Sequence, residues 1–276
     1  MNLVVQGPGL SEAEAQALAP LVGSSRIEPI AAGAFRLRNS AASAAVARWA
    51  EQRQADYAFM PEGRRFEALK LVAMDMDSTL ITIECIDELG ELAGKKAEVA
   101  AITAQAMRGE IAYPESLRRR VSALAGLSEA SLNTIYENRL KLTPGAEALI
   151  AACKKHGVQI LLVSGGFTFF TERLKKRLGL DHTISNVLEV KAGKLTGALV
   201  GDIVDAEAKA AKFRAVLSDL GAKKSESVAI GDGANDLKMM AEAGISVAFR
   251  AKPVVRAQAT CALNWSGLDG VVNLFE

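Results

Sequence analysis

Two short acidic motifs have residue types and spacing that favour chemistry. Asp75 and Asp77 stand in DMDST directly after the apolar run LKLVAM, and Asp232 and Asp236 stand in GDGAND directly after SVAI. Glycines beside the second pair let the backbone approach a ligand closely. Four carboxylates in one place would repel one another unless a hard cation neutralised them. Mg²⁺ suits an all-oxygen ligand set without histidine, and such a site indicates phosphate chemistry.

A second group of residues is suited to holding a phosphate. Ser164 follows the apolar run VQILLV and precedes Gly165 and Gly166, so a hydroxyl and open backbone N–H groups stand together. Lys209, in DAEAKAAKF, supplies a balancing positive charge. We therefore expect these residues to lie beside the two acidic motifs.

The elements that must position these groups are three apolar runs. LKLVAMDMD, VQILLVSGG and SVAIGDG each indicate a strand buried on both faces of a parallel sheet. The segments between them have a helical pattern, and AEALIAACKKHG and AKAAKFRAVLSDLG each end in the glycine that a helix C-terminus prefers. The sequence predicts an α/β fold with a doubly wound parallel sheet, in which ligands bind at the carboxyl ends of the strands.

Two further parts flank this core. The mainly helix-forming stretch at about 85–142 is too long for a simple βαβ connection and predicts a helical cap that closes over the site. TISNVLEVKAGKLTGALVGD predicts a hairpin that turns at Ala192 and Gly193. We expect residues 67–276 to form one domain around this sheet, with the cap inserted into it.

The first 66 residues predict a separate small α+β domain. Their pattern is β-α-β-β-α-β, with Ser11 and Glu14 at capping-box spacing before the first helix and a hairpin near Gly33. This order is that of a ferredoxin-like module, and residues 61–65 form the expected linker. We hypothesise a regulatory or dimerisation domain, through which the chain would form a homodimer.

Composition excludes several classes of protein. The 276 residues carry a net charge of +1, which argues against a general nucleic-acid binder, and half of them are hydrophobic, as in ordinary globular proteins. No stretch is long and apolar enough to span a membrane, and the start lacks a signal peptide, so we expect a cytoplasmic protein with no membrane partner. The three dispersed cysteines and two histidines favour neither a disulfide framework nor a zinc site.

DMDST, the serine before two glycines, the lysine and GDGAND together resemble the four ordered signatures of the haloacid-dehalogenase-like phosphatases. The resemblance runs from about Leu69 to the C-terminus. Glu84, nine residues after Asp75, followed by SLRRRV, VSGGF and GDGANDLKM, is similar to the phosphoserine phosphatases within that superfamily. The resemblance implies hydrolysis of O-phosphoserine to serine and phosphate, the last step of serine biosynthesis, with Mg²⁺ as cofactor.

The resemblance also implies a role for each residue of the site. Asp75 is the expected nucleophile, which forms an aspartyl phosphate, and Asp77 is the expected acid and base. The resemblance implies five groups as ligands or neighbours of the metal. They are Asp75, the Met76 carbonyl, Asp77, Asp232 and Asp236. Phosphoryl oxygens are expected to contact Ser164, Gly165, Lys209 and Asn235.

On the cap side, the resemblance places Glu84 on the substrate ammonium and Arg120 on its carboxylate, with Met107 and Tyr113 packed over the substrate. The sequence departs from the family at Tyr113 and Met76, where many relatives have Phe. The backbone at Met76 is what binds metal, so that change matters little. A hydroxyl at Tyr113 could alter cap closure or admit another substrate.

Alternatives remain open at this point. A phosphotransferase would form the same aspartyl phosphate and pass the group to an alcohol such as homoserine, and the substrate could be another small phosphomonoester. A phospho-accepting signalling module is disfavoured by Asp77 and the long cap, because both promote turnover. Each motif could instead have only a structural role. Ser78 or Thr79 would then be a helix N-cap, GDGAND an Asx-capped turn, and residues 118–120 a solvated helix face.

Overall fold

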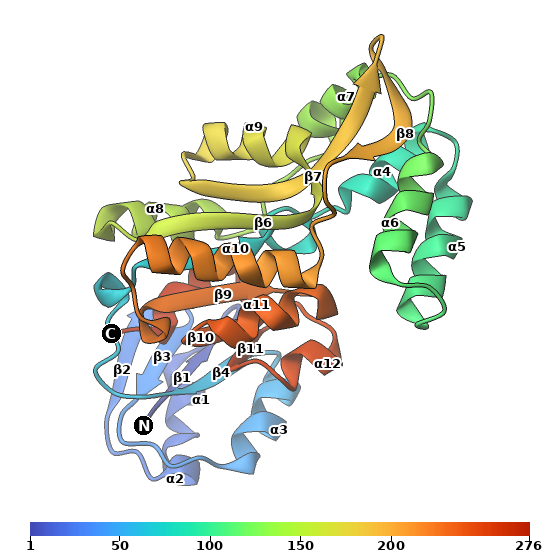
Figure 1. Ribbon diagram of the computed structural model, residues 1–276. Helices are drawn as coiled ribbons and strands as arrows, with labels where there is room; N and C mark the ends of the chain where they lie inside the picture. The colour runs from blue at the N-terminus through green and yellow to red at the C-terminus, as the bar shows by residue number, and fades with distance from the viewer.

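The computed structural model describes residues 1–276, whose strands form one mixed sheet (Figure 1). The strand order is β2-β3-β1-β4-β11-β10-β9-β5-β6-β7-β8. The parallel part consists of β5 (Leu71–Asp75), β6 (Gln159–Phe167), β7 (His182–Lys191), β9 (Ser227–Gly231), β10 (Ile245–Phe249) and β11 (Cys261–Leu263). The predicted strands at DMDST, VSGG and GDGAND are therefore confirmed, with β5 between β6 and β9.

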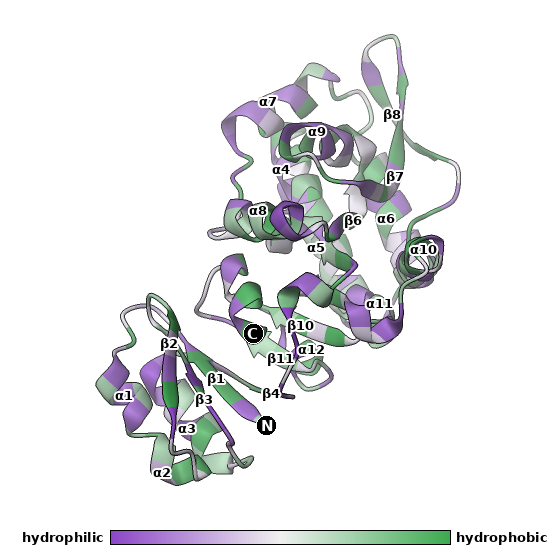
Figure 2. Cartoon of the chain, turned by 90° about the vertical axis from the view of Figure 1, so that its left-hand side faces the viewer, coloured by the Kyte–Doolittle hydropathy of each residue, from purple (hydrophilic) through white to green (hydrophobic).

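The parallel strands are buried on both faces because their residues alternate between two hydrophobic cores. Val72 and Met74 of β5 belong to the larger core, whereas Leu71 and Ala73 belong to the smaller one. The helices that cover the sheet are α8 (Ala146–His156), α9 (Thr168–Leu178), α10 (Ala206–Asp219), α11 (Leu237–Glu242) and α12 (Pro253–Arg256). Figure 2 shows apolar strands such as β10 beside helices with polar outer faces. This layering is the doubly wound α/β architecture expected from the apolar runs.

Four helices are inserted between β5 and β6 and stand apart from the sheet (Figure 1). They are α4 (Cys85–Leu92), α5 (Lys96–Met107), α6 (Tyr113–Ser122) and α7 (Ala130–Asn138). The hairpin of β7 and β8 (Lys194–Val200) turns at Ala192 and Gly193, both with positive φ, as expected. Gly197 of β8 packs against the end of α6, where an added Cβ would lie 3.2 Å from the Ser122 Cα. The hairpin therefore supports the inserted helices from one side.

The amino-terminal strands are β1 (Asn2–Gln6), β2 (Ile27–Ala31), β3 (Ala34–Leu37) and β4 (Asp56–Met60). They are antiparallel in the order β2-β3-β1-β4, and α3 (Ala44–Arg53) precedes β4. The Ser11 and Glu14 capping box is present, but the single first helix that we expected is two short helices, α1 (Glu12–Gln16) and α2 (Ala19–Val22). Pro20 explains the break, because its ring and missing N–H do not fit a helix interior. The domain division at 66/67 and the cap limits at 85–142 stay predictions.

The amino-terminal strands are paired with the parallel strands, so the two sets form one continuous sheet. Tyr57 of β4 pairs with Ala262 of β11, and Val4 and Met60 belong to the larger core together with β5 and β10. The remaining short helical turns are η1 (Phe66–Ala68), η2 (Met76–Leu80), η3 (Lys224–Glu226), η4 (Ala234–Asp236) and η5 (Leu268–Leu274). No helix has the length and apolar character needed to cross a membrane.

Asp56 joins the two parts of the sheet through hydrogen bonds. Its buried carboxylate accepts the backbone N–H groups of Asn264 at 2.6 Å, Trp265 at 3.1 Å and Ser266 at 2.8 Å. Strands β4 and β11 share a single residue pair, so this carboxylate supplies much of the polar contact at the junction.

We predict that Asp56→Ala lowers the free energy of unfolding by about 2 kcal/mol or more, because three N–H groups lose an ionised acceptor. Urea unfolding followed by circular dichroism measures the change. Asp202→Ala removes an exposed carboxylate and is the matched control, expected to change stability little. Equal unfolding midpoints for the two variants would show that Asp56 does not hold the junction.

Candidate active site

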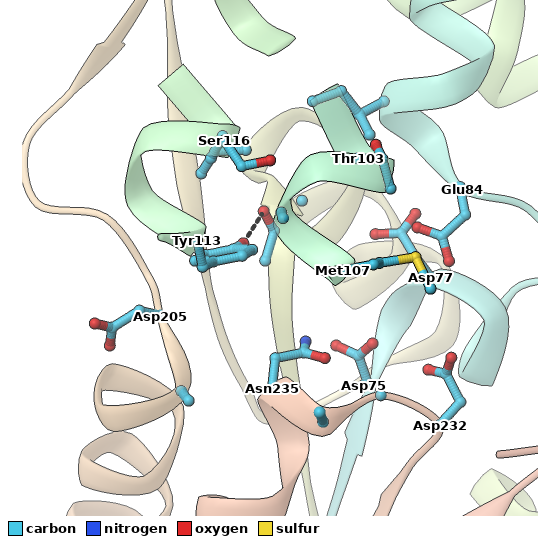
Figure 3. Close-up of a pocket in the computed structure, with 18 of the residues that line it drawn as sticks. Asp75, Asp77, Glu84, Thr103, Met107, Tyr113, Ser116, Asp205, Asp232 and Asn235 are labelled. Atoms are coloured by element: carbon cyan, nitrogen blue, oxygen red, sulfur yellow. Dashed lines mark hydrogen bonds between the residues drawn. The ribbon is translucent and has the colours of Figure 1, made fainter. Parts of the chain in front are cut away.

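The candidate active site lies where the sheet changes its winding direction. The chain continues from β5 to β6 on one side and later returns to place β9 on the other, so the loops after β5 and β9 diverge and leave a crevice. A cavity of about 820 Å³ occupies this position, between the strand ends and helices α5 and α6 (Figure 3). Nine predicted site residues line it: Asp75, Asp77, Glu84, Met107, Tyr113, Arg120, Gly165, Asp232 and Asn235. The other four, Met76, Ser164, Lys209 and Asp236, are buried.

Lys209 is buried between two carboxylates. Its Nζ donates to Asp75 Oδ1 at 2.6 Å and to Asp236 Oδ1 at 2.8 Å. Burial opposes the charge on Lys209, but the carboxylates of Asp236 and Asp75 outweigh that effect and raise its pKa. The other Asp236 oxygen accepts the Gly233 N–H at 3.1 Å. Lys209 therefore fixes one oxygen of Asp75, which also lines the cavity.

Three carboxylates fit a divalent cation. Ligand oxygens of Asp75, Asp232 and Asp236 all lie within 4.8 Å of one another. Burial and the charge of Asp236 raise the pKa of Asp232 to about 6, and the same two causes raise the pKa of Asp75 well above its usual range despite Lys209. The single ammonium of Lys209 leaves this cluster with excess negative charge, which an oxygen-binding cation would neutralise. Asp77 lies outside this set of three, and its part in a metal site stays a prediction.

Asp77 lies in a tight turn that directs its carboxylate away from Asp75. Ser78 has φ 57°, and the next α-helix begins only at Cys85. The hydroxyls of Ser78 and Thr79 donate to Glu84 and Asp232, so neither caps a helix and the N-cap interpretation of DMDST is wrong. Asp77 Oδ1 accepts the Cys85 N–H at 2.8 Å, and Ser164 Oγ lies 3.5 Å from its Oδ2. Desolvation and the nearby charge of Glu84 raise the pKa of Asp77 to about 7. This carboxyl can therefore both donate and accept a proton near neutral pH.

The strand end at 164–166 is held in an irregular conformation that suits anion binding. The register of β6 against β7 shifts between Val163 and Phe167, and Ser164 Oγ accepts the Gly166 N–H at 2.8 Å. Gly166 has no room for a side chain, because a Cβ would lie 2.8 Å from Asp77 Oδ2. The glycine thus allows the backbone to lie directly beside Asp77.

Asn186 of β7 is a residue of this region that the sequence did not predict. Its Nδ2 donates to the Gly165 carbonyl at 2.8 Å, and its Oδ1 accepts the Val204 N–H at 2.8 Å. It therefore orients the Gly165 peptide from behind. Strand β7 contains several other polar residues, so the residue type of Asn186 gave no local signal.

Helices α5 and α6 contribute charged and apolar groups to the cavity, and Glu84, which directly precedes α4, lies beside Asp77 (Figure 3). Glu84 Oε1 accepts a hydrogen bond from Ser78 Oγ at 2.6 Å. Arg120 lines the cavity and its Nε is buried without a partner, so it is not part of a solvated face. Tyr113 donates its hydroxyl to the Gly165 carbonyl at 3.2 Å, and burial raises its pKa to about 12. The hydroxyl that Phe would lack thus connects helix α6 to β6.

Among the residues of this region that were missed are Lys252 and Ser116, which line the cavity, and Thr79, which lies behind it. Lys252 lies after β10 and approaches the Met107 sulfur at 3.9 Å. Ser116 lies one turn before Arg120. Thr79, fully buried behind the cavity, donates to Asp232 Oδ1 at 3.3 Å. A contact between distant segments places Lys252, whereas Ser116 and Thr79 stand within SLRRRV and DMDST but were not assigned to the site.

Comparison with known proteins agrees with this geometry. Residues 72–241 match the family described as haloacid dehalogenase-like hydrolase, and residues 3–46 match a domain of unknown function (DUF4072). A protein named phosphoserine phosphatase from Polaromonas sp. is 56% identical over 212 residues, which are 75% of this chain and 90% of that protein.

Solved structures resemble the whole chain. The unliganded crystal structure of a probable phosphoserine phosphatase from Vibrio cholerae has a TM-score of 0.87 and 36% identity, and the match covers 99% of this chain and 86% of that one. A substrate-bound phosphoserine phosphatase complex has a TM-score of 0.71 and 36% identity over 75% of this chain and 99% of that chain. The family match spans more than half of the residues and includes both acidic motifs, so this chain belongs to the haloacid dehalogenase-like hydrolases.

Proposed function

We propose that this chain is a phosphoserine phosphatase, which hydrolyses O-phosphoserine to serine and phosphate as the last step of serine biosynthesis. One observation carries the proposal: a single cavity is lined by the carboxylates of Asp75 and Asp77 and also by the opposite charges of Glu84 and Arg120. The phosphate, ammonium and carboxylate of phosphoserine match these groups. The names of the relatives support the same substrate.

Asp75 is the proposed nucleophile. Lys209 holds one of its oxygens, which leaves the other to attack phosphorus. The bond between phosphorus and the serine oxygen breaks, and that oxygen takes a proton from Asp77. Asp77 then accepts a proton from the water that attacks the aspartyl phosphate, which releases phosphate and restores Asp75.

The groups around Asp75 would hold the phosphoryl oxygens. Ser164 and Gly165 lie near the end of β6, Lys209 lies in α10 and Asn235 lies in η4, which follows β9. Fixed N–H and ammonium donors stabilise the charge that develops in the transition state without having to reorganise. Asn186 donates a hydrogen bond to the Gly165 carbonyl and so holds the backbone at the irregular end of β6 in a fixed orientation.

Mg²⁺ is the proposed cofactor. The carboxylates of Asp75 and Asp232 and the Met76 carbonyl would hold it, with Asp236 beside them because both Asp236 oxygens already accept hydrogen bonds. The ion would supply positive charge to the nucleophile and to the phosphoryl oxygens.

The cap residues would select the substrate. Glu84 would accept hydrogen bonds from the ammonium, and Arg120 would grip the carboxylate with two parallel bonds. Met107 and Tyr113 would cover the carbon atoms between these charges. Met107 is 65% exposed, so it has an apolar surface that a bound substrate would cover.

Three expectations about the whole chain remain proposals. We propose a small amino-terminal domain at 1–66 with a regulatory or dimerisation role, a homodimer formed through it, and a cytoplasmic location. The antiparallel order β2-β3-β1-β4 supports the first. Light scattering on the full chain tests the second, and a monomer would contradict it.

The direct test of function is phosphate release from phosphoserine, phosphothreonine and phosphoethanolamine, each with and without Mg²⁺. We expect phosphoserine to have the highest kcat/KM and all activity to require the metal. If another ester is preferred, the substrate assignment is wrong although the family is unchanged. Adding homoserine addresses the phosphotransferase alternative, which predicts a new phosphoester in place of free phosphate.

Replacing the nucleophile should stop turnover. We predict that Asp75→Asn lowers phosphate release more than about 100-fold, because an amide oxygen is a poor nucleophile. Acid quench of the wild-type enzyme with labelled phosphoserine should trap label on the protein, and the variant should trap none. Turnover within a few-fold of wild type would remove Asp75 from this role.

The charge on α6 should discriminate between substrates. Arg120→Ala is expected to lower kcat/KM for phosphoserine by about 10- to 150-fold, through loss of hydrogen bonds to a carboxylate. Phosphoethanolamine lacks the carboxylate and should be affected little. Steady-state kinetics with both substrates measure the ratio.

Arg119→Ala is the matched control for this prediction. Arg119 is exposed on the same helix and pairs with Glu115, so its loss should change neither substrate. If Arg120→Ala slows both substrates equally, Arg120 is a structural residue. Glu84→Gln, by contrast, should slow both amines and spare a phosphate ester without an amine.

A further inference from the structure

Ser116 and Arg120 present two unsatisfied polar atoms to the cap side of the cavity. The Ser116 hydroxyl and the Arg120 Nε are both buried without a hydrogen-bond partner, and both residues line the cavity. Four positions separate them on α6, so their side chains lie on the same face of the helix. Figure 3 shows the Ser116 side chain on α6 beside Tyr113.

Two other hydroxyls within helices of this protein make a local hydrogen bond that Ser116 lacks. Thr103 and Thr134 donate to the carbonyl four residues before them, at 3.1 and 3.2 Å, which is the usual way to satisfy such a group. The equivalent carbonyl for Ser116, that of Ala112, accepts only the Ser116 backbone N–H. Ser116 is fully buried, yet its hydroxyl lacks the local bond.

The chemistry of the two atoms identifies the group that would satisfy both. Arg120 offers only donors, and a hydroxyl can donate as well as accept. An ammonium would leave the Arg120 N–H unsatisfied and would be repelled by the guanidinium. A carboxylate has two oxygens with about four lone-pair sites, so it can accept from both residues at once.

We propose that Ser116 is a specificity residue that donates a hydrogen bond to the substrate carboxylate held by Arg120. This inference rests on the proposed function, because it assigns one more contact to the amino-acid part of that substrate. Ser116 thereby makes the site selective for a phosphorylated amino acid over a phosphorylated amine.

The test is Ser116→Ala with phosphoserine and phosphoethanolamine as paired substrates. We expect KM for phosphoserine to rise at least about tenfold, as for loss of a hydrogen bond to a charged group, with kcat changed much less. Kinetics with phosphoethanolamine should be unchanged. Ser122→Ala removes an exposed hydroxyl from the same helix and should leave both substrates unaffected.

A double variant strengthens the assignment. If both residues bind one carboxylate, Ser116→Ala should cost much less when Arg120 is already alanine. An unchanged KM for phosphoserine, or equal losses for both substrates, would overturn the role of Ser116. Failure of the proposed function is distinguishable, because wild-type enzyme would then show no preference for phosphoserine.

Discussion

The buried ion pair network of Lys209 is the interaction on which the site depends. It joins α10 to the end of β5 through Asp75 and to the turn after β9 through Asp236. Removing one partner of such a buried network costs about 3–5 kcal/mol, because the remaining charge is left uncompensated. One ammonium cannot balance every carboxylate nearby, so the same network that fixes the strand ends also leaves negative charge for a cation. Stability of the core and affinity for metal therefore arise from one arrangement.

The sheet and the inserted helices divide the chemistry between them. Backbone held by strand pairing positions the groups around Asp75 and Asp77, where small displacements matter most. Of the two groups proposed to select the substrate, Arg120 comes from α6 of the insertion, whereas Glu84 directly precedes the insertion. A change in the insertion can thus alter the substrate while the reaction centre is preserved.

The sequence predicted those features that leave a local trace. Apolar runs that end in DMDST and GDGAND indicate buried strands, and the length between Asp77 and Ser164 indicates an insertion, so the core and most site residues were predicted. The pairing of β4 with β11 and the position of Asn186 depend on segments far apart in the chain, which leave no periodicity to detect. Pro20 was visible, but the capping box favoured one continuous helix. Ser116 was overlooked because a serine within a helix is ordinarily satisfied by its own backbone.

The Gly165 carbonyl accepts hydrogen bonds from two different parts of the molecule. Asn186 belongs to the sheet, whereas Tyr113 belongs to the insertion. If the insertion moved away from β6, the Tyr113 bond would break while the Asn186 bond remained, so the Gly165 peptide would keep its orientation. The backbone proposed to hold the phosphoryl group would then be in place before the insertion closed again. The energetic barrier to this opening includes a single neutral hydrogen bond at this point, which a phenylalanine in the same position would not impose.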